Sequence, residues 1–236
     1  MSRICLYGVG IDNVTMGEAV KIALAQVGAP CVVFTPNAVM LDAARREAAL
    51  CELLGRASLS LPDGMGVVRL AKRRGTPLKE RVAGIDFGEA LLERAAKEKL
   101  RVFLLGGGEG VAAQAARRLQ MRYPSLCICG TAWGYFDKNG EENQEVLARI
   151  HASRADILLV CMGFPLQEQW ITDNLHALSD VRVIAGLGGS LDVWSGRVNR
   201  APAPVSKMGL EWAWRMLREP RRIRYLPAVV RTVFKR

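Results

Sequence analysis

An α/β fold built on a mostly parallel sheet is predicted by three features of this 236-residue sequence. Short apolar runs rich in Val, Ile and Leu alternate along the chain with longer amphipathic stretches. Capping boxes mark the points where some of those stretches begin as helices. Half of the residues are apolar, which is enough to bury one large core. Strand and helix in regular alternation give a sheet with helices on both faces, a Rossmann-like arrangement.

The predicted strands are short apolar runs bounded by turn residues. They are expected at residues 3–7, 31–35, 59–61, 101–105, 126–129, 156–162 and 181–185. In a parallel sheet the loops that follow the strands all reach the carboxyl edge, where ligands of such sheets bind. Candidate functional residues are therefore sought in those loops.

Helices are expected between the strands. Thr15 followed by Glu18, and Asp86 followed by Glu89, are capping boxes that predict helix starts at these two points. Residues 67–73 form another amphipathic stretch, directly after the strand predicted at 59–61.

Positive charge is concentrated at the C-terminal end. Residues 197–236 contain eleven Lys and Arg but only two acidic residues, which gives +9 of the net +10 of the whole chain. Pro202 and Pro204 separate this segment from a nearly neutral body. We therefore predict an α/β body at residues 1–200 and a basic amphipathic helical appendage at 201–236.

The appendage is also apolar. Large side chains recur at helical spacing in two runs, Leu210, Ala213, Trp214 and Leu217, then Ile223, Leu226, Val230 and Val233. Basic and apolar residues so arranged are typical of a segment that lies on an anionic membrane or along a nucleic acid. The same face could instead pack on the body or on a second copy of the chain, and the sequence leaves that homo-oligomer open.

The cysteines and the apolar segments indicate a compartment. Six cysteines include no Cys-x-x-Cys pair, and Cys5, Cys31 and Cys161 lie in predicted strands, so buried free thiols in a reducing compartment are expected. The N-terminal apolar run is too short for a signal peptide, and the apolar stretch at 157–166 is about half of a membrane span. We expect a cytoplasmic protein that touches a membrane without crossing it.

Polar residues follow two of the predicted strands. Thr35 and Asn37 flank a proline after the strand at 31–35, and Asn37 could equally cap the next helix. Asp63 lies in a Pro-Asp-Gly turn after the strand at 59–61. This carboxylate is a candidate catalytic group, although the same tripeptide is ordinary turn chemistry.

A glycine loop that starts at Gly106 and Gly107 joins the strand at 101–105 to the next helix. Backbone N–H groups at such a helix start suit a phosphate. The dinucleotide fingerprint Gly-x-Gly-x-x-Gly fails, however, because its sixth position is Val111. No nicotinamide or flavin cofactor is therefore expected.

Gln167 and Glu168 follow the strand at 156–162, and Asp192 follows the strand at 181–185. Amides and carboxylates in these places can bind sugar hydroxyls, although an acid in a first helical turn is also favoured by the helix dipole alone. The sequence has no Asp-x-Asp pair and no His-rich cluster, so no metal site is expected.

Taken together and in order, the motifs resemble the WecG/TagA/CpsF family of bacterial glycosyltransferases. The resemblance runs from about residue 35 to residue 224. It rests on Thr35-Pro36-Asn37, Pro62-Asp63-Gly64, Arg81-x-x-Gly84, Leu105-Gly106-Gly107, Tyr123-Pro124, Gly134-Tyr135-Phe136, Gly163-x-Pro165-x-Gln167-Glu168, Gly188-Gly189-x-x-Asp192, Arg200-Ala201-Pro202, Gly209-Leu210-Glu211-Trp212 and Glu219-Pro220-Arg221.

The resemblance implies an inverting, metal-independent transfer of a sugar from a UDP-sugar to an undecaprenyl-diphosphate-linked sugar at the inner face of the membrane. In the best-known member type the sugar is N-acetylmannosamine, the acceptor carries GlcNAc, and the product is the teichoic acid linkage unit. Another donor in exopolysaccharide synthesis, such as UDP-ManNAcA or UDP-glucose, is the alternative.

Residue by residue, the resemblance implies that Asp63 is the general base and that Thr35, Asn37, Arg81 and Gln167 belong to the substrate pocket. The chain departs from the family at Leu166, where a lysine is frequent. That substitution leaves open which donor is used.

A metal-free transfer requires positive charge to neutralise the departing diphosphate. Arg81 is one candidate, and the arginines of the appendage are expected to contact the membrane or the diphosphate: Arg215, Arg218, Arg221, Arg222 and Arg224. A nucleic-acid-binding protein is the more distant alternative, since it could use the same basic segment but would not need polar loops at the strand ends. The expected partners are therefore a UDP-sugar, a lipid-diphosphate-linked sugar and an anionic membrane surface, and not a nucleic acid.

Overall fold

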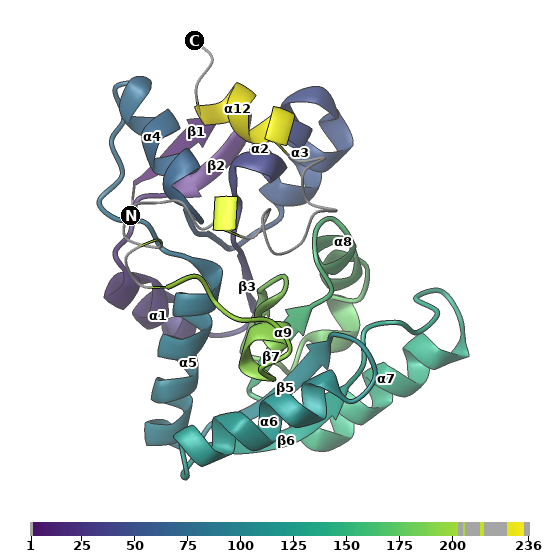
Figure 1. Cartoon of the computed structure of the whole chain (residues 1–236). Coiled ribbons are helices and arrows are strands. Elements are labelled where there is room, and N and C mark those ends of the chain that lie inside the picture. The colour runs from purple at the N-terminus through teal and green to yellow at the C-terminus, as the bar shows by residue number, and fades with distance from the viewer. Residues whose placement is uncertain (1, 203–204, 206–212, 215–225, 234–236) are drawn as a thin grey trace.

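A six-stranded parallel sheet forms the centre of the computed structural model, which describes residues 2–202, 205, 213–214 and 226–233 (Figure 1). The strand order is β4 (Leu59–Ser60), β3 (Cys31–Phe34), β8 (Val183–Gly186), β7 (Ile157–Cys161), β5 (Arg101–Gly106) and β6 (Cys127–Ala132). Every neighbouring pair is parallel. The predicted α/β class and mostly parallel sheet are thus confirmed, and the six carboxyl ends share one edge.

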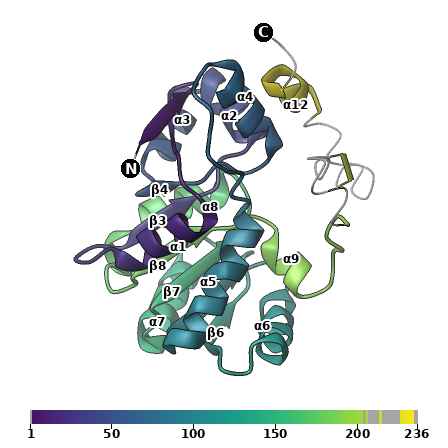
Figure 2. The same ribbon diagram turned by 90° about the vertical axis from the view of Figure 1, so that its left-hand side faces the viewer.

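Helices cover both faces because successive strand residues point to opposite sides. Val33 and Leu159 join the buried cluster under α1 (Met16–Ala25), α5 (Gly84–Glu98), α6 (Val111–Arg122) and α9 (Ser190–Trp194). Figure 2 shows α1 and α5 in front of the strands, with α6 and α9 to the right. Val32 and Leu158 join the opposite cluster with α2 (Ala38–Arg46), α3 (Ala48–Gly55), α4 (Met65–Arg73), α7 (Glu141–Ser153) and α8 (Leu166–Asp173).

The N-terminal residues form a separate antiparallel hairpin of β1 (Arg3–Leu6) and β2 (Val9–Asp12). Tyr7 and Gly8 have φ values of 52° and 85°, the two positive values that a type I′ hairpin turn requires. The sequence predicts the first strand but not its partner, because Gly8 and Gly10 interrupt the apolar pattern. Asp12 is buried, accepts two bonds from the Arg3 guanidinium and accepts the Ser60 N–H at 2.8 Å, which ties the hairpin to β4.

One of the two predicted capping boxes is present. The Glu18 N–H donates to Thr15 Oγ1 at 3.3 Å and the Thr15 N–H donates to Glu18 Oε2 at 2.8 Å, which caps α1. The prediction for Asp86 is wrong, since α5 begins at Gly84 and Asp86 lies inside its first turn. The Asp86 carboxylate instead forms ion pairs with two arginines, as described below.

All six cysteines are free thiols, and the expectation that three are buried holds for Cys31 and Cys161. Burial raises the pKa of the Cys161 thiol to about 12 and that of Cys31 to about 11. Cys5 is exposed, so the prediction is wrong there, because β1 belongs to the hairpin and not to the buried sheet.

The last described helix, α12 (Leu226–Val233), packs against α2 and α4 (Figures 1 and 2). Within the described ranges, no helix combines the length and the apolar character needed to cross a membrane.

Candidate functional site

The loops after β3, β4 and β8 are joined by hydrogen bonds at the carboxyl edge of the sheet. Thr35 is buried, and its Oγ1 donates to the Gly186 carbonyl at 3.2 Å, which links the ends of β3 and β8. The Asp63 N–H donates to the Pro36 carbonyl at 3.0 Å, which links the ends of β4 and β3. Three polar residues predicted from the sequence, Thr35, Asn37 and Asp63, are therefore held in one place.

Asp63 is half-buried in the short loop between β4 and α4. Gly64 follows it with a φ of 86°, a backbone conformation that favours glycine and that allows the sharp turn into α4. The Val82 N–H donates to the Pro62 carbonyl at 3.1 Å, which brings the segment containing Arg81 beside the Asp63 loop. Asp63 and Arg81 thus share this end of the carboxyl edge.

Asn37 caps α2. Its Oδ1 accepts the N–H groups of Val39 at 2.9 Å and of Met40 at 3.2 Å, so the capping alternative drawn from the sequence is the one that the geometry shows. A contact between Asn37 and a substrate remains a prediction.

Asp86, in the first turn of α5, forms ion pairs with two arginines. The Arg81 guanidinium lies 3.3 Å from Asp86 Oδ2, and the Arg200 guanidinium lies 2.5 Å from Asp86 Oδ1. One carboxylate thus faces two guanidinium groups. Arg200 joins this cluster from more than a hundred residues along the chain, which sequence spacing could not reveal.

The glycine loop after β5 needs glycine for packing. A Cβ on Gly106, whose φ is 134°, would lie 2.2 Å from the Cys161 carbonyl oxygen. The Gly107 N–H donates to the same oxygen at 3.1 Å, so this N–H group is occupied by β7 and is not presented to a phosphate. Phosphate binding by Gly106 and Gly107 stays a prediction, and it must use other N–H groups of the loop.

Arg197 is a candidate that the sequence analysis did not single out. Its Nη1 lies 3.2 Å from the position that a Cβ on Gly108 would take, which places the guanidinium against the glycine loop. The available signal was the Ser195-Gly196-Arg197 turn after α9, where Gly196 has a φ of 79°.

Gln167 and Glu168, at the start of α8, are both buried, with 3% and 0% of their surfaces exposed. Gln167 Oε1 accepts the Gly163 N–H at 3.2 Å and the Gly188 N–H at 2.9 Å, and Nε2 donates to Glu168 Oε1 at 2.8 Å. Burial raises the pKa of the Glu168 carboxyl to about 7, an effect that the Gln167 bond partly offsets. These side chains lie behind the carboxyl-edge loops and not on their surface.

Asp192, half-buried in α9, lies close to the loop after β8, with Oδ2 3.8 Å from the position of a Cβ on Gly189. After β6, Trp133 and Tyr135 expose 44% and 75% of their surfaces, and their ring centroids are 6.5 Å apart. The Gly134 N–H between them donates to the Gly107 carbonyl at 2.9 Å. Two exposed aromatic rings thus stand beside the glycine loop.

The appendage is described at α12. Ala228 and Val229 are buried there, and the Arg231 guanidinium donates to both oxygens of Asp42, at 3.0 and 2.7 Å. Leu226 and Val230, predicted to lie on one apolar face, are exposed to 38% and 37%. The predicted contact residues Arg215, Arg218, Arg221, Arg222 and Arg224 lie outside the described residues.

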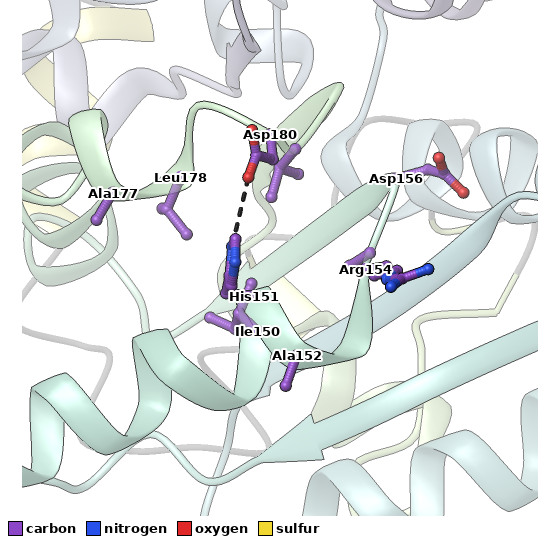
Figure 3. Close-up of a pocket in the computed structure, with 10 residues that line it drawn as sticks. Ile150, His151, Ala152, Arg154, Asp156, Ala177, Leu178 and Asp180 are labelled. Atoms are coloured by element: carbon purple, nitrogen blue, oxygen red, sulfur yellow. Dashed lines mark ion pairs between the residues drawn. The ribbon is translucent and has the colours of Figure 1, made fainter.

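Two hollows occur elsewhere. The first hollow has a volume of about 530 Å³ and lies between the end of α7 and residues 177–181 (Figure 3). It is next to the short helix η1 (His176–Leu178), at the amino end of β7. There His151 Nδ1 lies 3.3 Å from Asp180 Oδ2. The other, of about 610 Å³, lies between α1 and α5. Neither is lined by a residue predicted for the site.

Across the described part of the chain, no three His, Cys, Asp or Glu side chains are grouped as metal ligands would be. The carboxyl edge therefore offers the half-buried Asp63 carboxylate beside two arginines at Asp86, together with a glycine loop and exposed aromatic rings.

Comparison with known proteins points in one direction. Residues 4–236 match the glycosyl transferase WecG/TagA/CpsF family. An N-acetylglucosaminyldiphosphoundecaprenol N-acetyl-beta-D-mannosaminyltransferase of Bacillus spizizenii is 39% identical over 186 residues, which cover 78% of this chain and 70% of the relative. A protein of the same name from Staphylococcus aureus (strain MRSA252) is 34% identical over 238 residues, which cover 99% of this chain and 92% of the relative.

Proposed function

Because this chain belongs to the WecG/TagA/CpsF family of glycosyltransferases, we propose that it transfers N-acetylmannosamine from UDP-ManNAc to GlcNAc-diphosphoundecaprenol. Two relatives at 34% and 39% identity carry the name of this reaction. The structural observation that carries the proposal is the position of Asp63, at the carboxyl edge beside the segment of Arg81, which meets Arg200 at Asp86.

In this reaction a hydroxyl oxygen of the acceptor GlcNAc attacks the anomeric carbon of the donor sugar. The bond between that carbon and the diphosphate oxygen breaks, and UDP leaves with the electron pair. Asp63 accepts the proton of the attacking hydroxyl, as a general base in a single displacement that inverts the anomeric centre. One carboxylate suffices because no covalent intermediate forms.

Negative charge develops on the leaving diphosphate and must be stabilised. Arg81 and Arg200 lie at Asp86, and Arg197 lies against the glycine loop. We assign these arginines, with N–H groups of the loop and the basic appendage, to the diphosphate. Thr35, Asn37 and Asp192 are assigned to the pocket around the sugars.

A lipid-linked acceptor requires the enzyme to work at a membrane surface, which we place on the cytoplasmic side. The net charge of +9 in residues 197–236 favours an anionic leaflet. The outward-facing Leu226 and Val230 of α12 add apolar surface to that segment.

The test is to incubate the protein with a panel of UDP-sugars and a short-chain lipid-diphosphate-GlcNAc acceptor, with and without excess EDTA, and to weigh the products. We expect a product heavier by one N-acetylhexosamine from UDP-ManNAc, in both conditions. Transfer from another UDP-sugar but not from UDP-ManNAc would change the donor assigned to the enzyme. Transfer that requires added metal would refute the metal-free mechanism. Absence of transfer from every donor would refute the proposal.

A further inference from the structure

The buried pair of Gln167 and Glu168 connects two loops of the carboxyl edge. Gln167 Oε1 accepts the Gly163 N–H from the loop after β7 and the Gly188 N–H from the loop after β8. A single amide oxygen therefore joins the ends of two neighbouring strands. We call Gln167 and Glu168 the brace.

The orientation of the Gln167 amide follows from its partners. Backbone N–H groups can only donate, so the atom that faces Gly163 and Gly188 must be the oxygen. The nitrogen then faces Glu168, whose Oε1 lies 2.8 Å away and accepts its N–H. If the amide rotated by half a turn, an NH₂ group would face two other donors and a carbonyl would face a carboxylate.

Glu168 adds to this preference, because its Oε1 accepts the amide N–H. Its side chain has no exposed surface, so in this structure it cannot touch a substrate. Its Oε2 has no hydrogen-bond partner among the residues described, which is a cost that an apolar side chain at this position would avoid. A buried carboxyl kept at that cost indicates a function other than packing.

The place of the brace in the sheet gives that function. β8 and β7 lie between β3 and β4 on one side and β5 on the other. Asp63 follows β4 and the glycine loop follows β5. A change in the spacing of the loops after β7 and β8 would therefore alter the distance between Asp63, the proposed general base, and the glycine loop.

We propose that Glu168 is a positioning residue, which holds the Gln167 amide and thereby fixes the β7 and β8 loops at the separation that aligns the acceptor hydroxyl with the anomeric carbon. This role rests on the proposed function and replaces the sugar contact expected for Glu168 from the sequence. Small misalignments of reacting groups lower turnover more than they lower binding.

The kinetic test compares Glu168→Leu, Glu168→Gln and the matched control Asp173→Asn, which changes an exposed acid on the same helix. We expect Glu168→Leu to lower kcat at least tenfold with the KM for the UDP-sugar within about threefold of wild type. Glu168→Gln keeps an acceptor oxygen for Gln167 and should retain at least ten times the kcat of Glu168→Leu, while Asp173→Asn behaves as wild type. Equal losses in both Glu168 variants would overturn the proposal, because the carboxylate itself would then be required.

A second pair of variants tests the bond if Glu168→Leu does not fold. Gln167→Glu places two carboxyl groups together and removes the N–H donor, whereas Gln167→Glu combined with Glu168→Gln exchanges donor and acceptor and restores one bond. We expect the double variant to recover at least tenfold in kcat over Gln167→Glu. Additive losses would contradict a brace.

Amide hydrogen exchange separates failure of the brace from failure of the proposed reaction, because it needs no substrate. In Glu168→Leu we expect faster exchange at Gly163 and Gly188. Leu187 precedes Gly188 in the loop after β8, and its N–H donates to the Val160 carbonyl of β7 at 2.9 Å, so its exchange should be unchanged and is the internal control. Unchanged exchange at both glycines would refute the brace, even if the wild-type enzyme transfers sugar as proposed.

Discussion

Asp63, at the carboxyl edge of the sheet after β4, is the proposed general base. Asp63→Asn keeps the size of the side chain but removes the proton acceptor, so we expect kcat to fall about a hundredfold or more. The melting temperature should stay unchanged, as calorimetry can show. Asp180→Asn, in the hollow at the amino end of the sheet, is the control. A rate within a few fold of wild type would assign the proton to another group.

Glu168 should also affect the pH dependence of stability. Its carboxyl pKa is raised from 4.5 to about 7 in the folded chain, so between these values the folded state binds a proton that the unfolded state has lost. The free energy of unfolding should therefore fall as pH rises through this window, by on the order of 3 kcal/mol at most. Urea denaturation of wild type and Glu168→Gln should diverge there, and parallel curves would contradict the raised pKa.

At this scale the sequence predicted which loops carry polar residues but not which way the side chains point. Asn37, Gln167 and Glu168 were all expected to contact substrate. Gln167 and Glu168 are buried, because the packing of α8 against the sheet decides which side of its first turn faces inward, whereas Asn37 caps α2 and its contact with a substrate stays a prediction. Arg197 and Arg200 reach the site through contacts far apart in sequence, which no local pattern contains.

α12 packs on the body through residues that the sequence analysis did not single out. The spacing of four put Leu226 and Val230 on one apolar face, which could lie on a membrane or pack on the body. In the structure both are exposed, and the residues buried where α12 packs against α2 and α4 are Ala228 and Val229. The small side chain of Ala228 allows α12 to approach α2 and α4 closely. The bonds from Arg231 to the buried Asp42 then fix which residues of α12 face the body.

The Asp42–Arg231 pair should therefore control the docking of α12. Arg231→Gln leaves Asp42 with Arg45 and Arg46 at 3.6 and 3.2 Å, so we expect a lower free energy of unfolding and faster proteolysis near residues 226–233. The Arg231 bond lowers the pKa of Asp42 below 3.8, so the contribution is complete above that pH and disappears as pH falls through the lowered pKa. Arg94→Gln, an exposed control, should change neither. Unaltered proteolysis in Arg231→Gln would show that the apolar contacts alone dock the helix.

Gly106 offers a test of how tightly the loop after β5 packs. Its φ is positive and a Cβ would collide with the Cys161 carbonyl, so Gly106→Ala should cost about 2 to 4 kcal/mol in urea denaturation. Gly17→Ala in α1 meets nothing within 4 Å and should be neutral or stabilising by about 0.5 to 1 kcal/mol. Equal effects of the two substitutions would mean that the loop yields easily.

For the whole molecule, the alternation of strand and helix predicted the fold class, whereas the strand order β4-β3-β8-β7-β5-β6 had to come from the structure. Order depends on which crossovers pack best, and local patterns do not contain that choice. The split into a body and an appendage at residue 200 remains a prediction, although α12 packs on the body.

The basic appendage should decide where the enzyme works. Changing Arg221, Arg222 and Arg224 together to Glu reverses three charges in a segment outside the described residues. At roughly 1 kcal/mol for each basic residue near an anionic leaflet, partitioning to anionic vesicles should fall about a hundredfold or more. Binding to neutral vesicles and circular dichroism should not change. Unaltered sedimentation with anionic vesicles would remove the membrane assignment, and retention on DNA instead would favour the nucleic-acid alternative.

The strand order also sets a minimum length for any ligand that reaches both Asp63 and the glycine loop. Four strand-to-strand steps separate β4 from β5, which at the usual spacing is about 19 Å across the edge. A free phosphate or a single sugar is too short to contact both ends at once. Only an elongated molecule, such as a nucleotide-sugar, or a donor and an acceptor bound end to end, can contact both Asp63 and the glycine loop.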